Sequence, residues 1–567
     1  MGSRRTWRAV CGVAIAGTLA ATVRAQGVVS VDGSADADGI GLPWRDLVVP
    51  EEARLFATVP AAGDAYGRAV ALDGDTLVVG APQSDSPMNG PGFAEVWVRT
   101  ASGWVREACL ADPLGASDDL FGFAVDVSGD LVAVGAFGKS QDAGAVYVFA
   151  RAAGVWDFDG LVSPLGGEPS DFFGFSVALQ GTVLVVGAPN DRDAASIGAG
   201  PGAVYVFERS VGLWRQRVRL ASGDVGNLRR FGWSVDVDED GDRIAVGERA
   251  LSDDLGRAFV YERNGTRWGS SSLEAARLSG SDSVLGDRFG YAVALHGSAL
   301  AVGAPAAEAA GFERAGAVYS FADDGTAWTE GMTVRAPQPS DDAFFGTSLD
   351  MVADALAVGE DQFEPVAPRA GAAYVYGWTE RGWLPAAVLR GGGLVGGDRY
   401  GTSVAVAGTL AAVGAQHADQ AALDGGAAYV FSYRGTITSF CQALASSTGE
   451  PALLSARGPA SVSLDRLVLE AQPVPAGQAG LFFYGSDEVE QPFGDGYLCI
   501  AGALHRLPPH VASGGVLRHA LAIDDPPEPA GQITAGSTWK FQAWFRDPAA
   551  GLSGFNLSDG LSVTFVP

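Results

Sequence analysis

Hydrophobic and polar positions follow the same four-part pattern seven times along the chain. In the third copy, FGFSVAL alternates, TVLVVGAP is apolar, GAVYVF is rich in β-branched and aromatic residues, and LWRQRVRL is a fourth strand-like run. Alternation with a period of two predicts a half-buried strand, and a short apolar run next to glycine predicts a buried one. Each copy is therefore expected to form four strands.

Two glycine motifs keep the copies in register. An aromatic-Gly pair opens each copy, and the glycine of a Val-Gly step follows 13 residues after the pair's glycine, or 15 in the fourth copy. The turns between the first two strands are short and centred on glycine, as at Gly74 and Gly129, which predicts tight antiparallel hairpins. Repeated four-stranded antiparallel units are typical of a β-propeller. We therefore predict an all-β fold in which residues 51–434 form a seven-bladed β-propeller of four-stranded blades. The seven pairs are Tyr66-Gly67, Phe121-Gly122, Phe173-Gly174, Phe231-Gly232, Phe289-Gly290, Phe345-Gly346 and Tyr400-Gly401.

The sequence also predicts how the ring closes. Leu110, Leu220 and Leu278 mark outer strands, and each stands 11 residues before the next aromatic-Gly pair. Leu55 stands at the same distance before Tyr66, but no blade precedes it. We therefore expect residues 52–58 to supply the outer strand of the seventh blade, which hides two sheet edges.

The motifs resemble the FG-GAP repeat. The aromatic-Gly pair is followed by Val-Gly-Ala-Pro at Gly80-Ala81-Pro82, Gly187-Ala188-Pro189 and Gly303-Ala304-Pro305. The Ala-Pro half is lost at Phe137, Glu248-Arg249, Glu360-Asp361 and Gln416. The chain is thus similar to bacterial FG-GAP proteins with an integrin α-subunit-like propeller. The resemblance implies adhesion or ligand binding outside the cell, and it does not imply catalysis.

The C-terminal part of the chain loses the repeat. Residues 435–567 contain six or more short alternating runs, which predicts a β-sandwich. LFFYGS, FQAWFRDP and the closing GFNLSDGLSVTFVP resemble C-terminal domains on secreted proteins of environmental bacteria, which implies surface attachment or ligand binding. An oxidising compartment permits a disulfide between Cys441 and Cys499, and the paired and unpaired states are both open.

The N-terminus has the features of an export signal. Residues 1–25 combine a basic start, a 15-residue apolar stretch and a small-residue cleavage site, and residues 26–50 read as a linker. A secreted, periplasmic or cell-surface location is therefore expected, by the general or the twin-arginine route. No later apolar run is long enough for a transmembrane segment in the mature chain.

The charge narrows the classes of partner. The formal net charge is −28, which disfavours nucleic acid and anionic lipid surfaces as partners. An extracellular protein or glycan ligand is the expected partner. The alternative is that the excess of acidic residues only keeps the protein soluble and marks no binding partner.

Candidate ligand contacts lie in the longest loops, which we expect on one face of the ring. Binding residues concentrate on such loops, although acidic loop residues are also common turn formers. The candidates are Asp85, Asp118, Asp119, Asp191, Asp193, Asp341, Asp342, Glu360 and Asp361.

Two further sets of carboxylates have two interpretations each. Asp236, Asp238, Asp240 and Asp242 begin like a calcium loop, but no closing acidic ligand follows, so an acidic, elongated hairpin is the alternative. Calcium is the one cofactor that the sequence raises. Asp126, Asp236 and Asp350 each stand four residues after the glycine of the pair, where they would line the channel of a propeller. Either they bind a cation or act as paired acids there, or they accept backbone N–H groups.

Catalytic motifs such as HExxH, GxSxG and the Walker loop are absent from the sequence. Two hypotheses follow. The favoured one is an exported, non-catalytic adhesion or ligand-binding propeller, and the alternative is an extracellular glycan-processing enzyme that uses the channel carboxylates.

Overall fold

The computed structural model describes residues 48–565 except for 50, 83–89, 101, 113, 193–199, 224–228, 250–254, 266–267, 270–272, 362–369, 380–381, 434–436, 458–459, 461, 463–466, 524–527, 535, 550 and 552. The expected signal segment and nearly all of the expected linker lie outside these residues. The described residues fall into two compact units, one made by 51–431 and the other by 48–49 and 432–565. Besides strands, they contain the short helical segments α1 (Lys139–Asp142) and η2 (Pro529–Gly531).

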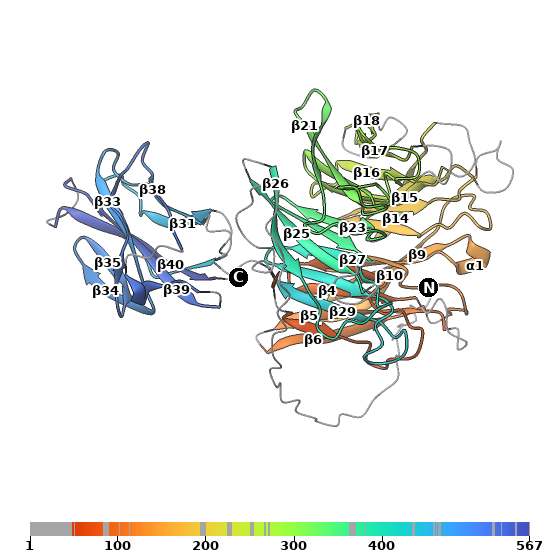
Figure 1. Cartoon of the computed structure of the whole chain (residues 1–567), viewed down its shortest axis with the longest axis horizontal. Helices are drawn as coiled ribbons and strands as arrows, with labels where there is room; N and C mark the ends of the chain where they lie inside the picture. The colour runs from red at the N-terminus through yellow and green to blue at the C-terminus, as the bar shows by residue number, and fades with distance from the viewer. Residues whose placement is uncertain are drawn as a thin grey trace. The chain divides into compact units, whose positions relative to one another are not determined.

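The first unit consists of sheets in which consecutive strands lie side by side (Figure 1). The first strands of the seven repeats are β3 (Ala69–Asp73), β7 (Ala124–Ser128), β11 (Ser176–Gln180), β15 (Phe231–Val237), β19 (Ala292–His296), β23 (Phe345–Val352) and β27 (Tyr400–Ala407). The second strands are β4 (Thr76–Ala81), β8 (Leu131–Ala136), β12 (Val183–Ala188), β16 (Arg243–Glu248), β20 (Ala299–Ala304), β24 (Ala355–Glu360) and β28 (Leu410–Ala415).

The third and fourth strands complete the same sheets. The third strands are β5 (Phe93–Thr100), β9 (Ala145–Ala152), β13 (Ala203–Ser210), β17 (Arg257–Glu262), β21 (Ala317–Asp323), β25 (Ala372–Thr379) and β29 (Ala427–Ser432). The fourth strands are β6 (Gly103–Leu110), β10 (Val155–Val162), β14 (Leu213–Leu220), β18 (Leu273–Leu278), β22 (Trp328–Val334) and β26 (Gly382–Leu389). In the last repeat this place is taken by β2 (Ala53–Leu55), which pairs antiparallel with β29.

The first strands form a closed cycle. Each contacts the first strand of the next repeat, and β27 contacts β3. Parallel bridges join the aromatic of one repeat to the glycine before the third strand of the previous repeat, and the bridge between Tyr66 and Gly426 joins the first repeat to the last. The predicted all-β β-propeller is therefore confirmed. The channel is the space that the first strands enclose.

The two repeated glycines meet between neighbouring repeats. A side chain at Gly80 would place its Cβ 2.0 Å from the carbonyl oxygen of Gly122 in the next repeat. The same approach is found in all seven repeats, and Gly414 meets Gly67 across the ring closure at 1.9 Å. Backbones approach this closely only when no Cβ lies between them. This contact explains why both glycines recur at a nearly constant spacing.

The hydrophobic core lies between adjacent sheets. The second strands are apolar because they are central in their sheets, and β12 is buried along its whole length. The aromatics of the aromatic-Gly pairs are fully buried, as at Phe121, Phe173 and Phe231. One core cluster combines Leu55 and Tyr66 with Leu410 and Val430, so apolar packing also spans the junction of the first and last repeats.

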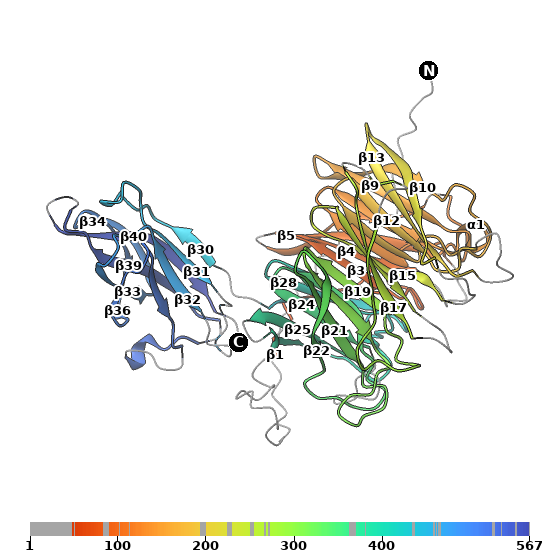
Figure 2. The ribbon, with the colours of Figure 1, turned by 90° about the horizontal axis from the view of Figure 1, so that it is seen from above.

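The second unit is built from different strands. β33, β39 and β40 lie side by side in its largest sheet (Figure 2). The β-sandwich stays a prediction, as do the exact domain bounds. The short strand β1 (Val48–Val49) precedes the repeats in the chain. The strands after the repeats are β30 (Ile437–Phe440), β31 (Leu453–Arg457), β32 (Val468–Gln472), β33 (Ala479–Gly485), β34 (Asp487–Phe493), β35 (Gly496–Ala501), β36 (His505–Arg506), β37 (His510–Val511), β38 (Leu517–Ala520), β39 (Thr538–Arg546) and β40 (Phe555–Thr564).

Candidate functional site

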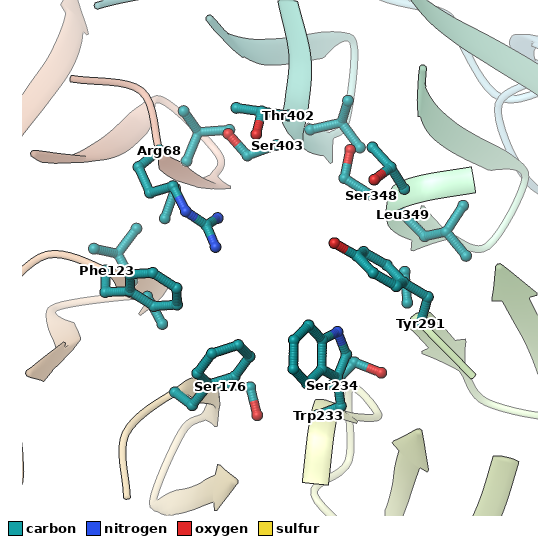
Figure 3. A pocket seen from close by; sticks show the side chains of 18 of the residues that line it. Arg68, Phe123, Ser176, Trp233, Ser234, Tyr291, Ser348, Leu349, Thr402 and Ser403 are labelled. Carbon is teal, nitrogen blue, oxygen red and sulfur yellow. The ribbon is translucent and has the colours of Figure 1, made fainter. Parts of the chain in front are cut away.

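The residue that follows each aromatic-Gly pair lines one cavity at the end of the channel. We call this cavity, which has a volume of about 540 Å³, the channel mouth. Its side chains surround an open centre into which Arg68, Trp233 and Tyr291 project (Figure 3). The seven residues at the repeated position are Arg68, Phe123, Phe175, Trp233, Tyr291, Thr347 and Thr402.

Local backbone geometry brings these positions together. The residue before each aromatic-Gly pair has a positive φ, between 52° and 61°, so the chain turns sharply before it enters the first strand. Serine two positions after the pair then joins neighbouring repeats. Ser176, Ser348 and Ser403 donate from Oγ to the glycine carbonyl of the next repeat at 2.8 to 3.0 Å. In these repeats the first strand is thereby bonded to the aromatic-Gly pair of the next repeat.

Four consecutive repeats contribute an aromatic ring to the channel mouth. The centroid distances are 5.1 Å from Phe123 to Phe175, 4.6 Å from Phe175 to Trp233, and 5.7 Å from Trp233 to Tyr291. We call these four residues the aromatic arc. Ring pairs at such distances pack favourably, and a concave wall of rings presents flat apolar surface to a ligand.

Arginines lie on the aromatic arc. The guanidinium of Arg68 lies 4.1 Å from the ring centroid of Phe123, and that of Arg249 lies 4.3 Å from Trp233 and 5.1 Å from Tyr291. Arg249 comes from the Glu248-Arg249 pair that replaces Ala-Pro in the fourth repeat. These are cation–π contacts, which hold the charged groups in the wall of the cavity.

One carboxylate faces these cations in the described part of the channel mouth. Asp361 lines the cavity and forms an ion pair of 2.5 Å with Arg399, which also lines it. The channel mouth therefore combines an apolar curved wall, three arginines and one aspartate. Such a site can bind a molecule through ring stacking and through bonds from guanidinium N–H groups.

The predicted channel carboxylates join neighbouring first strands. Each accepts two backbone N–H bonds, one from the following residue and one from the next repeat. Asp126 accepts from Leu179 at 2.5 Å, and Asp236 accepts from Leu295 at 2.6 Å. Asp350 accepts from Val406 at 2.6 Å. Of the two interpretations, these bonds support the acceptor of backbone N–H groups, because both oxygens of each carboxylate are already used.

These carboxylates predict an unusual pH dependence of stability. Burial is the largest cause that raises the pKa of Asp126 to about 7 and that of Asp350 to about 6, although both accept backbone bonds that act in the opposite direction. A raised pKa in the folded state means that folding takes up protons, so stability is full below the ordinary pKa of about 4 and falls as the pH rises towards 7. We expect the free energy of unfolding to be about 1–3 kcal/mol smaller at pH 8 than at pH 5.5.

Chemical denaturation at the two pH values measures this difference. The double variant Asp126→Asn, Asp350→Asn cannot titrate at these positions and should show a flatter profile. Equal slopes for the variant and the unaltered chain would mean that other groups cause the pH dependence.

Two predicted loop contacts, Asp119 and Asp191, are buried and form ion pairs within the first unit. Asp119 is 5% exposed and forms an ion pair of 2.9 Å with Lys139. Asp191 is 3% exposed and forms an ion pair with Arg219. Both carboxylates therefore have partners within the protein.

The other predicted loop contacts are spread over the unit. Glu360 is fully buried at the end of β24, where desolvation raises the pKa of its carboxyl above the ordinary value. Asp361 is the candidate that lines the channel mouth among the described residues. Asp85 and Asp193 lie outside the described residues. The exposed or half-exposed candidates are Asp118, Asp341 and Asp342.

The acidic hairpin of the fourth repeat is held by internal bonds. Asp238 accepts the N–H groups of Asp242 at 2.9 Å and Arg243 at 3.1 Å, and Asp242 pairs with Arg263. Asp236 bonds the next repeat, as described above, and Asp240 is exposed. Across the described residues, no three His, Cys, Asp or Glu side chains gather into a group that could hold a metal. The contacts of this hairpin support the elongated acidic turn.

The second unit contains the disulfide that the sequence left open. Cys441 and Cys499 are joined, with their Cα atoms 6.0 Å apart. A cavity of about 350 Å³ in this unit is lined mainly by apolar side chains, among them Phe483, Trp544 and Leu557. Within the described part of the chain, no helix has the length and hydropathy needed to cross a bilayer.

The aromatic arc was missed by reasoning from sequence alone. Its signal is the residue directly after each aromatic-Gly pair, which reads Arg, Phe, Phe, Trp, Tyr, Thr, Thr through the seven repeats. In each repeat this residue stands just before or near the start of the first strand, so each aromatic considered by itself looks like ordinary strand composition. Comparison of the same position in all repeats would have found it.

Comparison with known proteins supports the repeat assignment. A family described as FG-GAP repeat matches residues 49–95, 104–149, 156–207, 273–321 and 383–431. Each match ends at or near the third strand of a repeat, and the unmatched fourth and sixth repeats carry Glu248-Arg249 and Glu360-Asp361 in place of Ala-Pro. Among solved structures, the crystal structure of Chaetomium thermophilum Sqt1 is similar, at 16% identity over 65% of this chain and 83% of that chain, with a TM-score of 0.39. No curated protein matches the sequence.

Proposed function

Because five segments of this β-propeller chain match the FG-GAP repeat, we propose that the protein is a non-catalytic binding protein that takes up its ligand at the channel mouth. One observation carries the proposal: four repeats in a row place an aromatic ring on the wall of a cavity of about 540 Å³. Aromatic walls of this kind are typical of ligand sites. The cavity lies at the start of the first strands, where the long connectors from the fourth strands arrive, so the ligand would bind at the centre of the long-loop face.

We place this activity outside the cell or at its surface, in adhesion or ligand binding to an extracellular protein or glycan. The basic start and apolar stretch of residues 1–25 support export. The disulfide between Cys441 and Cys499 is also typical of oxidising compartments. Cell fractionation that recovers the chain in the cytoplasm with residues 1–25 intact would contradict this location.

Catalysis by the channel carboxylates has less support. A glycosidase requires one carboxyl group that is free to protonate the leaving group and another that is free to attack or to activate water. Asp126, Asp236 and Asp350 instead use both oxygens to hold backbone N–H groups. The contacts therefore favour binding without turnover.

Replacement of Trp233 tests the proposal. We expect Trp233→Ala to weaken binding at least tenfold for any ligand that the unaltered chain retains, because the change removes the central ring of the aromatic arc. The measurement is a screen of the purified full chain against arrays of extracellular glycans and peptides, with and without calcium, followed by titration of each hit.

Trp378→Ala is the matched control. Trp378 is 55% exposed and lies in the third strand β25, away from the channel mouth, so its loss should leave binding unchanged. If hits bind equally well to the Trp233→Ala variant and the unaltered chain, the ligand site lies elsewhere and the proposal is wrong.

A further inference from the structure

Two arginines of the channel mouth lack an acidic partner among the described residues. Arg68 and Arg249 lie on the aromatic arc, and neither forms an ion pair with a described carboxylate. The Nε of Arg249 is buried without a hydrogen-bond partner. Exposed arginines are freely hydrated, but these two are held against apolar rings and lose part of their water.

The surroundings add to the positive charge. Desolvation is the largest cause that lowers the pKa of Arg68 and of Arg249 from the ordinary value. The charges of Arg288 and Arg230 lower the pKa of Arg249 further, and for Arg68 the charge of Arg399 lowers the pKa while that of Asp361 raises it. Asp361 is the one carboxylate in the described lining of the cavity, and Arg399 already pairs with it. The channel mouth is thus cationic in a chain whose net charge is −28.

This local charge has a physical cost that a ligand could remove. An arginine that is desolvated without a partner destabilises the free protein, and a bound anion would restore the lost interactions. Neither guanidinium forms an ion pair with a described carboxylate, so its N–H groups are available to donate to a planar anion. A singly charged carboxylate also costs less to bring into an apolar cavity than a doubly charged phosphate.

We propose that the channel mouth binds a carboxylate carried on a ring, with the carboxylate at Arg68 or Arg249 and a face of the ring against the aromatic arc. This inference rests on the proposed function and specifies its ligand class. Two sources provide such a group: a sugar acid at the end of a polysaccharide, whose ring presents flat C–H faces, and an aromatic acid. The cavity volume of about 540 Å³ accommodates either.

Paired probes test the need for the negative charge. The full chain is titrated by calorimetry at neutral pH with an oligomer of galacturonate and with 2-naphthoate, and each acid is compared with its methyl ester. The ester keeps the ring and loses the charge. We expect at least one acid to bind at least ten times more tightly than its ester. Preference for the galacturonate oligomer identifies a sugar acid, and preference for naphthoate identifies an aromatic acid.

Single substitutions test the two arginines. At least one of the substitutions Arg68→Gln and Arg249→Gln should weaken binding of the preferred acid at least tenfold and leave binding of the ester unchanged. Arg215→Gln is the matched control, because Arg215 is exposed on the fourth strand β14 and its loss changes the net charge equally. Thermal unfolding of each variant shows whether the fold is intact.

The outcomes separate this inference from the proposed function. If acids and esters bind equally well and Trp233→Ala abolishes this binding, the inference that a carboxylate is required is wrong. The channel mouth would then still be the binding site. Failure of both acids to bind at millimolar concentration would also overturn the inference. Acid binding that neither Arg68→Gln nor Arg249→Gln weakens would place the anion elsewhere and overturn it as well.

Discussion

Replacement of Gly303 by alanine is expected to destabilise the first unit by about 3 kcal/mol or more. The added Cβ would lie 2.2 Å from the carbonyl oxygen of Gly346 in the next repeat, and a backbone atom cannot move aside as the end of a side chain can. Neighbouring sheets would have to separate along a contact that recurs around the whole ring. The midpoint of thermal or chemical unfolding of the full chain measures the effect.

Gly377→Ala is the control for this substitution. Gly377 lies in β25, and a Cβ there would meet Ala386 at 3.6 Å, which is ordinary van der Waals contact. We expect a change below about 1 kcal/mol at this position. If the two variants unfold at the same midpoint, the glycine contact between repeats does not limit how closely the sheets pack.

Removal of the carboxylate of Asp236 should have the second large effect, a loss of about 2–4 kcal/mol at pH 5.5. Asp236→Ala leaves the N–H groups of Val237 and Leu295 without their acceptor, and each unsatisfied buried donor costs about 1–3 kcal/mol. Part of this loss is offset because the cost of desolvating the carboxylate also disappears. Denaturant unfolding of the full chain gives the difference.

Asp240→Ala provides the comparison within the same hairpin. Asp240 is exposed, so its removal should change the stability by less than about 0.5 kcal/mol. A loss at Asp240 as large as that at Asp236 would indicate that the hairpin, rather than the bond between β15 and β19, is responsible.

The sequence predicts secondary structure well where the pattern depends on residues that are close in the chain. The alternation in strands such as FGFSVAL and the glycine turns such as Gly74 depend on residues close in the chain, so the four-stranded antiparallel sheets could be predicted. The close approach of Gly80 to Gly122 explains why these glycines recur. The sequence shows their regular spacing, but it does not show that they contact each other.

Candidate contacts in the loops were harder to predict. Asp119 and Asp191 looked like exposed loop acids, but Lys139 and Arg219 neutralise them inside the fold. The partner of Asp191 lies on a different strand, β14, and no periodicity of the sequence reports which arginine a loop acid will meet. Composition therefore identified acidic loops without showing which carboxylates remain free.

By itself, the sequence determined the strands, their hairpins and their sevenfold repetition, because these follow from side-chain periodicity and from backbone preferences within a few residues. Tertiary structure alone decided which residues of different repeats share a site. Asp126 holds an N–H group 53 residues away, and Arg68 reaches the ring of Phe123 in the next repeat. Such contacts depend on how the sheets are placed around the channel, and only the closed cycle of first strands brings the aromatic arc and its arginines together.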